Sequence, residues 1–157
     1  MPTIMIVDDS SVTRKVIKKH IKSGPYATCE LVEAPNGEQA LDTFKSGQKV
    51  DVVLSDWNMP KMNGLEFVKG LRAFEAETQV PNPVKVIMIT TEGTIDKVTA
   101  AMESGVNEYI VKPFTADTLT KTLKKVLSKD EFLNVMQHLK ANYYTFYRFS
   151  IIFFHSG

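Results

Sequence analysis

"VDVVLSDWNMPKMNG", residues 50–64, runs from an apolar segment into a bare carboxylate, Asp56, and then into a loop that contains proline and glycine. A short apolar run bounded by turn residues is typical of a strand that is buried on both faces of a sheet. The most hydrophobic strand of the chain is therefore expected to end in a carboxylate. This raises the question of whether Asp56 is a metal ligand, a base or a nucleophile.

Four further short apolar runs are present, and a segment of helical period follows each of the five runs. The other runs lie at 4–7, 29–34, 84–89 and 108–111, and helices are predicted over about 10–23, after the "PNG" at 35–37, over about 64–77, over about 94–104 and from about 115. Strict alternation of strands and helices predicts an α/β fold, a doubly wound parallel sheet with helices on both faces. Its crossover connections should be right-handed.

The spacing of apolar residues also predicts which side of each helix faces the sheet. Asp9 or Ser10 can cap the first helix, because both side chains accept hydrogen bonds from a helix N-terminus. The inward residues are expected to be Val12, Val16, Ile17 and Ile21 in the first helix, Leu65, Val68 and Leu71 in the helix over 64–77, and Ile95, Val98 and Met102 in the helix over 94–104.

Polar residues follow four of the five apolar runs at the point where each run ends. They are Asp8 and Asp9, Asp56, Thr90 and Lys112. Because the carboxyl ends of parallel strands lie at one edge of a sheet, where ligands bind, these residues should converge on one small pocket. Each has an ordinary reading when taken alone, such as a helix cap or a solvated lysine, but their joint placement is hard to obtain by accident.

The pocket has the chemistry of a phosphoryl-transfer site. Three carboxylates repel one another, and an oxygen-rich, sulphur-free set suits a hard cation, most simply Mg²⁺. Lys112 and Thr90 then favour binding of a phosphoryl group, one as a point charge and the other through its hydroxyl. Asp56 is the candidate nucleophile, because carboxylates can form acyl-phosphates. The metal and Lys112 would stabilise charge on the transferring group.

Bulk composition is that of one ordinary globular domain. The chain has 157 residues, a formal net charge of +1 and one cysteine, Cys29. Nucleic acid and anionic membranes are therefore not expected as partners, and an internal disulfide or a cysteine-based zinc cluster is excluded. No signal peptide and no membrane-spanning segment of about 20 apolar residues is seen, so we expect a cytoplasmic protein.

Four segments identify a resemblance to the receiver domains of bacterial two-component response regulators, and to CheY-like chemotaxis regulators in particular. They are "IMIVDDS" at 4–10, "VVLSDWNMPKMNGLEFVKGLR" at 52–72, "VIMITTEG" at 86–93 and "GVNEYIVKPF" at 105–114. The resemblance covers residues 1–128. It implies a flavodoxin-like fold whose five strands are ordered 2-1-3-4-5, and a cis peptide bond before Pro113.

The resemblance also implies a role for each matching residue at the reaction centre. Asp56 would be the phosphoacceptor and would bind Mg²⁺ together with Asp9, with Asp8 reaching the metal through water. Asn58 would offer its backbone carbonyl to the metal. Lys112 would bridge to the phosphoryl group.

Four positions, Asn58 again among them, match the family's switch and its control of phosphorylation lifetime. Thr90 would move inward to hydrogen-bond the phosphoryl group, and Tyr109 would turn from an exposed to a buried position as it does so. Asn58 and Glu92 would tune the attack of water on the acyl-phosphate. Their pairing resembles that of chemotaxis regulators with short-lived phosphorylation.

The function implied is that of a signalling receiver, which catalyses only its own phosphorylation and dephosphorylation. It would take a phosphoryl group from a histidine kinase with Mg²⁺ and present a switched face to a partner, by analogy a flagellar motor switch protein. The alternatives are a receiver-only phosphorelay protein or a regulator that dimerises through its C-terminal tail. A phosphohydrolase of aspartyl-phosphate type is disfavoured, because such enzymes typically carry a second acid where Asn58 stands.

Residues 129–157 have no counterpart in this family, so we divide the chain into a receiver domain, 1–128, and an aromatic-rich extension. The segment 143–157, "YYTFYRFSIIFFHSG", has seven aromatic residues and a single charged one, Arg148. An exposed apolar segment of this kind promotes aggregation. The extension should therefore pack on the receiver or pair with a second copy of the chain. Otherwise it is a segment introduced by cloning or by a shifted reading frame.

Overall fold

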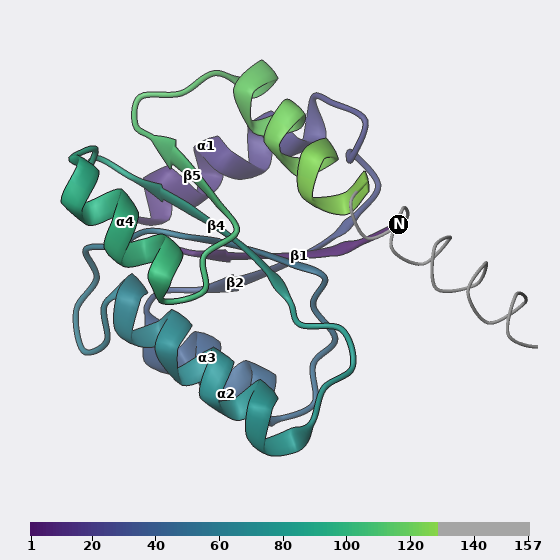
Figure 1. Cartoon of the computed structure of the whole chain (residues 1–157). Coiled ribbons are helices and arrows are strands. Elements are labelled where there is room, and N and C mark those ends of the chain that lie inside the picture. Colours follow the sequence, from purple (N-terminus) through teal and green to yellow (C-terminus); the bar gives the residue numbers. More distant parts are fainter. Residues whose placement is uncertain (129–157) are drawn as a thin grey trace, which may run out of the picture. The chain divides into compact units, whose positions relative to one another are not determined.

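Five parallel strands form one sheet in the order β2-β1-β3-β4-β5 in a computed structural model, which describes residues 1–128 (Figure 1). The strands are β1 (Thr3–Val7), β2 (Glu30–Ala34), β3 (Val52–Ser55), β4 (Lys85–Thr90) and β5 (Glu108–Val111). The helices are α1 (Ser11–Lys22), α2 (Gly37–Lys45), α3 (Gly64–Thr78) and α4 (Ile95–Glu103), and residues 116–128 are also helical. The predicted fold class and strand order are confirmed.

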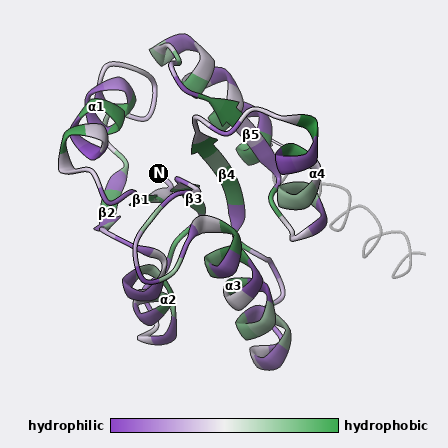
Figure 2. Ribbon diagram, turned by 90° about the vertical axis from the view of Figure 1, so that its left-hand side faces the viewer, coloured by the Kyte–Doolittle hydropathy of each residue, from purple (hydrophilic) through white to green (hydrophobic). Residues whose placement is uncertain are grey.

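The sheet's core follows from the alternation of side chains along its strands. Met5, Val7, Val53, Val86 and Met88 belong to one buried cluster with residues of α2, α3 and α4. The intervening strand residues point to the other face, because successive side chains alternate across a strand. In Figures 1 and 2, α1 lies on one face of the sheet, and α2 and α3 lie together on the other. Continuous apolar strands are thus covered on both sides.

The register of the central strands places their ends side by side. Val7 of β1 pairs with Ser55 of β3, and also with Ala34 of β2. The residue that follows each of these two strands is an acid, Asp8 after β1 and Asp56 after β3. The register therefore places the two acids side by side. The Asp56 N–H donates to the Val7 carbonyl (2.9 Å), which extends the ladder by one residue, up to Asp56.

Polar caps begin the four labelled helices just beyond this edge of the sheet. Ser10, Asn36, Asn63 and Thr94 each accept a hydrogen bond from a backbone N–H in the first turn of the helix that they cap. Ser10, rather than Asp9, caps α1. The Asp9 carboxylate is therefore not used as the helix cap.

The predicted inward face of α1 is partly wrong. Ile17 and Ile21 are buried, but Val12 and Val16 are exposed. Val16 lies about 100° around the helix from Ile17, and only one of the two stripes can face the sheet. The sequence offers apolar residues on both stripes, so periodicity alone did not separate them.

The predicted face of α4 is also partly wrong. Ala101 is its buried residue, Val98 is half-buried, and Ile95 and Met102 are exposed. A small alanine lets the helix approach the sheet closely, while Met102 lies about 100° further around. In α3, Val68 and Leu71 are buried as predicted, and Leu65 is partly buried against the core.

The predicted extension, 129–157, lies outside the described residues, so the boundary after residue 128 remains a prediction. Residues Met1–Thr122 form one compact unit. None of the helices within residues 1–128 combines the length and the apolar character that crossing a membrane requires.

Candidate functional site

Three carboxylates meet at the carboxyl edge of the sheet. One carboxylate oxygen from each of Asp8, Asp9 and Asp56 lies within 4.8 Å of the other two. Asp8 is buried, Asp56 is half-buried and Asp9 is exposed. β1 and β3 are neighbours in the sheet, so residues that stand 48 positions apart along the chain are brought together by strand pairing alone.

The Lys112 ammonium lies between two of these acids. Its Nζ is 3.0 Å from Asp8 Oδ2 and 3.4 Å from Asp56 Oδ2. The Lys112 backbone N–H donates to the Thr90 carbonyl at the end of β4 (2.9 Å), which holds the lysine at the same edge. The peptide bond between Lys112 and Pro113 is cis, as predicted. A cation therefore lies between two of the acids.

The Asp56 carboxylate has a defined orientation. Its Oδ1 accepts a hydrogen bond from the Trp57 N–H (2.7 Å), which leaves Oδ2 facing Lys112. The Trp57 carbonyl in turn accepts from the Gly64 N–H (2.8 Å), which closes the loop between β3 and α3. One oxygen of the candidate nucleophile is thus anchored and the other faces the cation.

A second set of contacts holds Asp8 in place. Asp8 Oδ1 accepts from the Ser10 N–H (2.9 Å), and Arg14 Nη1 donates to the Asp8 carbonyl (2.6 Å). Arg14 is also ion-paired with Glu33 of β2 (3.1 Å). The pKa of Glu33 lies below its usual value, chiefly because Lys18 hydrogen-bonds its carboxylate. Arg14 was not predicted as a site residue, and no local sequence signal marks it.

Glu92 connects the predicted lifetime and switch residues. Its carboxylate accepts from the Asn58 amide (3.0 Å), and its backbone N–H donates to the Thr90 hydroxyl (3.4 Å). The Tyr109 hydroxyl donates to the Glu92 carbonyl. Burial raises the pKa of Tyr109, and the negative charges of Glu92 and Asp56 raise it further. Within residues 1–128 the Thr90 hydroxyl makes no hydrogen bond to Asp56.

A further contact at the mouth of the site was also not predicted. The Lys97 Nζ lies 4.8 Å from the centroid of the Trp57 ring. Lys97 belongs to the first turn of α4, and Trp57 follows the candidate nucleophile directly. Neither residue type nor spacing signals such a pair, because the contact depends on how α4 is placed.

The donor set fits a divalent cation. All three clustered side chains are carboxylates, the oxygen ligands that Mg²⁺ prefers, and the site lies at a surface where water could complete the coordination. The Asn58 amide is directed to Glu92, and the role of its backbone carbonyl as a metal ligand remains a prediction.

Comparison with known proteins identifies the family. Residues 4–124 match the response regulator receiver domain. A chemotaxis protein CheY homolog of Campylobacter jejuni is 42% identical over 124 residues, which cover 79% of this chain and 91% of the relative. Chemotaxis protein CheY1 of Helicobacter pylori J99 is 40% identical over 128 residues, 82% of this chain and 98% of the relative.

A solved structure supports the same relationship. Chemotaxis protein CheY4 of Vibrio cholerae superposes with a TM-score of 0.68 at 34% identity, covering 80% of this chain and 98% of that chain. The chain therefore belongs to the receiver domain family of two-component response regulators. Within that family it is a CheY-like receiver domain.

Proposed function

We propose that this protein is a phosphorylation-dependent signalling switch whose acceptor is Asp56. The observation that carries the proposal is the position of the Lys112 ammonium, 3.0 Å and 3.4 Å from two carboxylates of a three-acid cluster. Such a site combines a nucleophilic oxygen, a cation to neutralise the incoming phosphoryl group and ligands for Mg²⁺. The protein transfers a phosphoryl group onto Asp56 and later to water, and it is not expected to act on other substrates.

The residues of the chain perform most of this chemistry. Asp56 Oδ2 attacks the phosphorus in line with the leaving group, while the Trp57 N–H holds Oδ1. Lys112 stays within reach of a phosphoryl oxygen and stabilises its negative charge. Asp8, Asp9 and Asp56 would hold Mg²⁺, with the Asn58 carbonyl as a further ligand, and the ion would supply charge neutralisation. After transfer, the acyl-phosphate is open to hydrolysis.

The switch would operate through Glu92. A phosphoryl group on Asp56 adds acceptor oxygens to which the Thr90 hydroxyl can donate. Thr90 and Tyr109 both bond to the main chain of Glu92, so a movement of Thr90 changes the surroundings of the Tyr109 ring. The face formed by α4 and β5 would then repack and change its affinity for a partner.

The partners follow from the relatives. A histidine kinase is the expected phosphoryl donor, and a flagellar motor switch protein the expected target, because relatives are named as chemotaxis proteins. The second candidate output is a phosphorelay step or dimerisation through residues 129–157. Analytical ultracentrifugation of the full chain and of a chain ending at residue 128 separates these outputs, since loss of a dimer on truncation favours the tail.

Replacing Asp8 should weaken the affinity for Mg²⁺. We expect Asp8→Asn to raise the dissociation constant about 10- to 100-fold, because residues that act on a metal through water or hydrogen bonds typically contribute that much. Titration of the Trp57 fluorescence with MgCl₂ measures the constant, and CaCl₂ tests the selectivity. An unchanged constant would show that Asp8 plays no part in metal binding.

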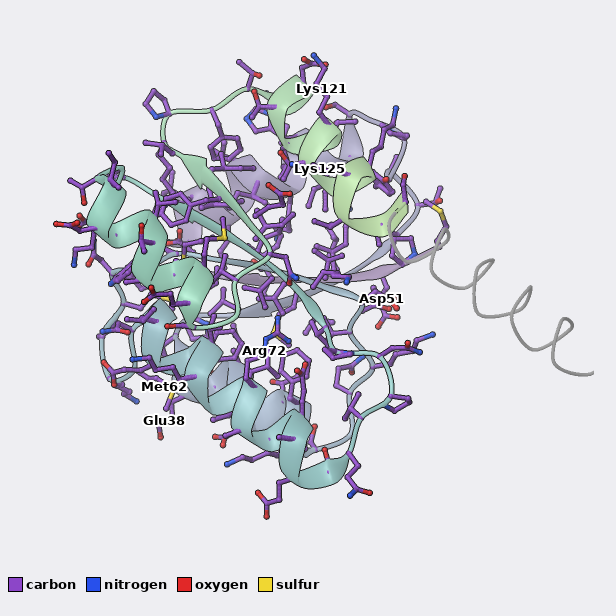
Figure 3. The ribbon with its side chains drawn as sticks, in the orientation of Figure 1. Glu38, Asp51, Met62, Arg72, Lys121 and Lys125 are labelled. Atoms are coloured by element: carbon purple, nitrogen blue, oxygen red, sulfur yellow. The ribbon has the colours of Figure 1, made fainter. Side chains whose placement is uncertain are left out.

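The Asn58–Glu92 hydrogen bond should control the lifetime of the acyl-phosphate. We expect the isolated phosphorylated protein to decay well within hours. Glu92→Ala removes a hydrogen bond to a charged group, which contributes about 1.5 kcal/mol, and this energy corresponds to a half-life about tenfold longer. Decay after removal of the donor is followed on Phos-tag gels. Glu38→Ala, which removes an exposed acid of α2 (Figure 3), is the control. A wild-type protein that stays modified for many hours contradicts the prediction.

A further inference from the structure

The two ends of α4 are held very differently. Ala101, in its C-terminal half, is buried in the core, whereas Ile95 at its start is 84% exposed. An element with so little buried surface at one end opens at low free energy unless another contact holds it. The contacts of the first turn therefore decide how firmly α4 is attached beside the site.

Lys97 provides such a contact in the first turn. The Thr94 side chain caps the helix and accepts from the Lys97 N–H (3.3 Å), which anchors the backbone of the lysine in the first turn. The lysine Nζ then lies 4.8 Å from the centroid of the Trp57 ring, within the range of a cation–π interaction. The Trp57 side chain is only 6% exposed, although it belongs to a loop.

Through Trp57 this contact reaches the acceptor. The Trp57 N–H donates to Asp56 Oδ1 at 2.7 Å, and the Trp57 carbonyl accepts from Gly64 at 2.8 Å. A displacement of Trp57 would therefore change the direction of the Asp56 carboxylate. Because Oδ2 is already 3.4 Å from Lys112, a small rotation alters the distance between the nucleophile and the cation.

We propose that Lys97 is a positioning residue of the acceptor site: its contact with the Trp57 ring joins α4 to the loop that carries Asp56 and orients the carboxylate for attack. The inference rests on the proposed function, since it assigns a second residue to that same reaction. Within residues 1–128, Lys97 forms no hydrogen bond or ion pair with Asp8, Asp9 or Asp56. It acts through Trp57, alongside the separate Asn58–Glu92 hydrogen bond, which joins the same loop to the segment that precedes α4.

The test compares Lys97→Met with Lys97→Arg. Methionine keeps much of the length and removes the charge, whereas arginine keeps the cation–π contact. We expect Lys97→Met to slow phosphorylation by acetyl phosphate at saturating Mg²⁺ about two- to fivefold, which matches the strength of an exposed cation–π pair. Lys97→Arg should restore the rate. Lys69→Met, at an exposed lysine of α3, is the matched control and should leave the rate unchanged.

The fluorescence of Trp57 provides a measurement that a general loss of stability would not change. It is the only tryptophan of the chain, so its fluorescence is unambiguous. Without any phosphoryl donor, Lys97→Met should make Trp57 more accessible to acrylamide quenching and shift its emission, and Lys97→Arg should not. The rate effect should persist at high salt, because a contact pair is screened less than long-range attraction of an anionic donor.

Each other outcome overturns the inference. An unchanged quenching constant with a slowed reaction would place the effect of Lys97 somewhere other than Trp57. Altered quenching with an unchanged rate would show that the contact does not orient Asp56. A rate effect that disappears at high salt would assign Lys97 to electrostatic steering of the donor. Failure of the wild-type protein to accept phosphate contradicts the proposed function itself, and the quenching arm still measures the Lys97 contact.

Discussion

Asp56→Asn should abolish phosphorylation by acetyl phosphate. The amide has nearly the same shape as the carboxylate, and its oxygen can still accept from the Trp57 N–H. Its nitrogen, however, has no free electron pair for attack on phosphorus, and the side chain no longer supplies a negative charge beside Lys112. We expect incorporation to fall by at least 100-fold, the usual scale for loss of a group that acts directly in the reaction.

Intact-mass spectrometry after incubation with acetyl phosphate and Mg²⁺ measures the incorporation, and Trp57 fluorescence follows it in real time. Asp51→Asn is the matched control, because Asp51 precedes β3 as Asp56 follows it. Asp51 lies at the opposite edge of the sheet (Figure 3), where its carboxylate accepts from the Thr3 N–H (2.8 Å), and an amide oxygen can do the same. Full incorporation in Asp56→Asn would remove Asp56 as the acceptor.

The sheet and the acid cluster could be predicted because one physical rule governs both. Runs rich in valine and isoleucine form buried parallel strands, and parallel strands end at one edge. Once the runs are recognised, the residues that follow them must meet. Asp8 and Asp56 follow paired residues of β1 and β3, and Lys112 follows β5. Their convergence therefore requires no knowledge of side-chain packing.

The faces of the exposed helices could be predicted only in part. Val12 and Val16 repeat with the same spacing as Ile17 and Ile21, so the sequence of α1 contains two apolar stripes. Which stripe is buried depends on how the helix is rotated against the sheet, and that rotation is set by the sum of tertiary contacts. The exposed stripe of α1 thus follows from packing that no local pattern encodes.

Two contacts made by basic side chains of the helices could not be predicted. Arg14 supports the backbone of Asp8 and pairs with Glu33, and Lys97 lies over Trp57. Each pair joins two elements through long, flexible side chains, whose meeting depends on rotamers and on the separation of those elements. An ordinary lysine or arginine on a helix gives the same local sequence signal whether or not it makes such a contact.

Gly64 is the point at which the loop that follows Asp56 meets α3, and there is no room for a side chain at this position. A Cβ built on Gly64 would lie 2.1 Å from the Asp56 carbonyl oxygen and 3.0 Å from the Trp57 Cα. Both are backbone atoms, which cannot move aside without displacing Asp56. The Gly64 N–H also donates to the Trp57 carbonyl (2.8 Å), so the close approach is part of the loop's closure.

Gly64→Ala should therefore disrupt stability and phosphorylation together. We expect the free energy of unfolding to fall by about 3 kcal/mol, in the upper range for single substitutions, because the loop must move and lose the hydrogen bond to Trp57. Asp56 moves with the loop, so incorporation from acetyl phosphate should fall at least tenfold even in the folded fraction. Urea unfolding followed by circular dichroism gives the first quantity, and intact mass the second.

Gly70→Ala, six residues further along α3, separates this clash from the general effect of alanine in a helix. Its Cβ would lie 3.1 Å from Leu41 Cδ2, the end of a flexible side chain that can shift. Alanine also favours a helix by about 1 kcal/mol over glycine. The net change in stability should stay within about 1 kcal/mol, with normal phosphorylation. Equal effects at both glycines would show that the approach of Gly64 to the Asp56 carbonyl does not hold the acceptor in place.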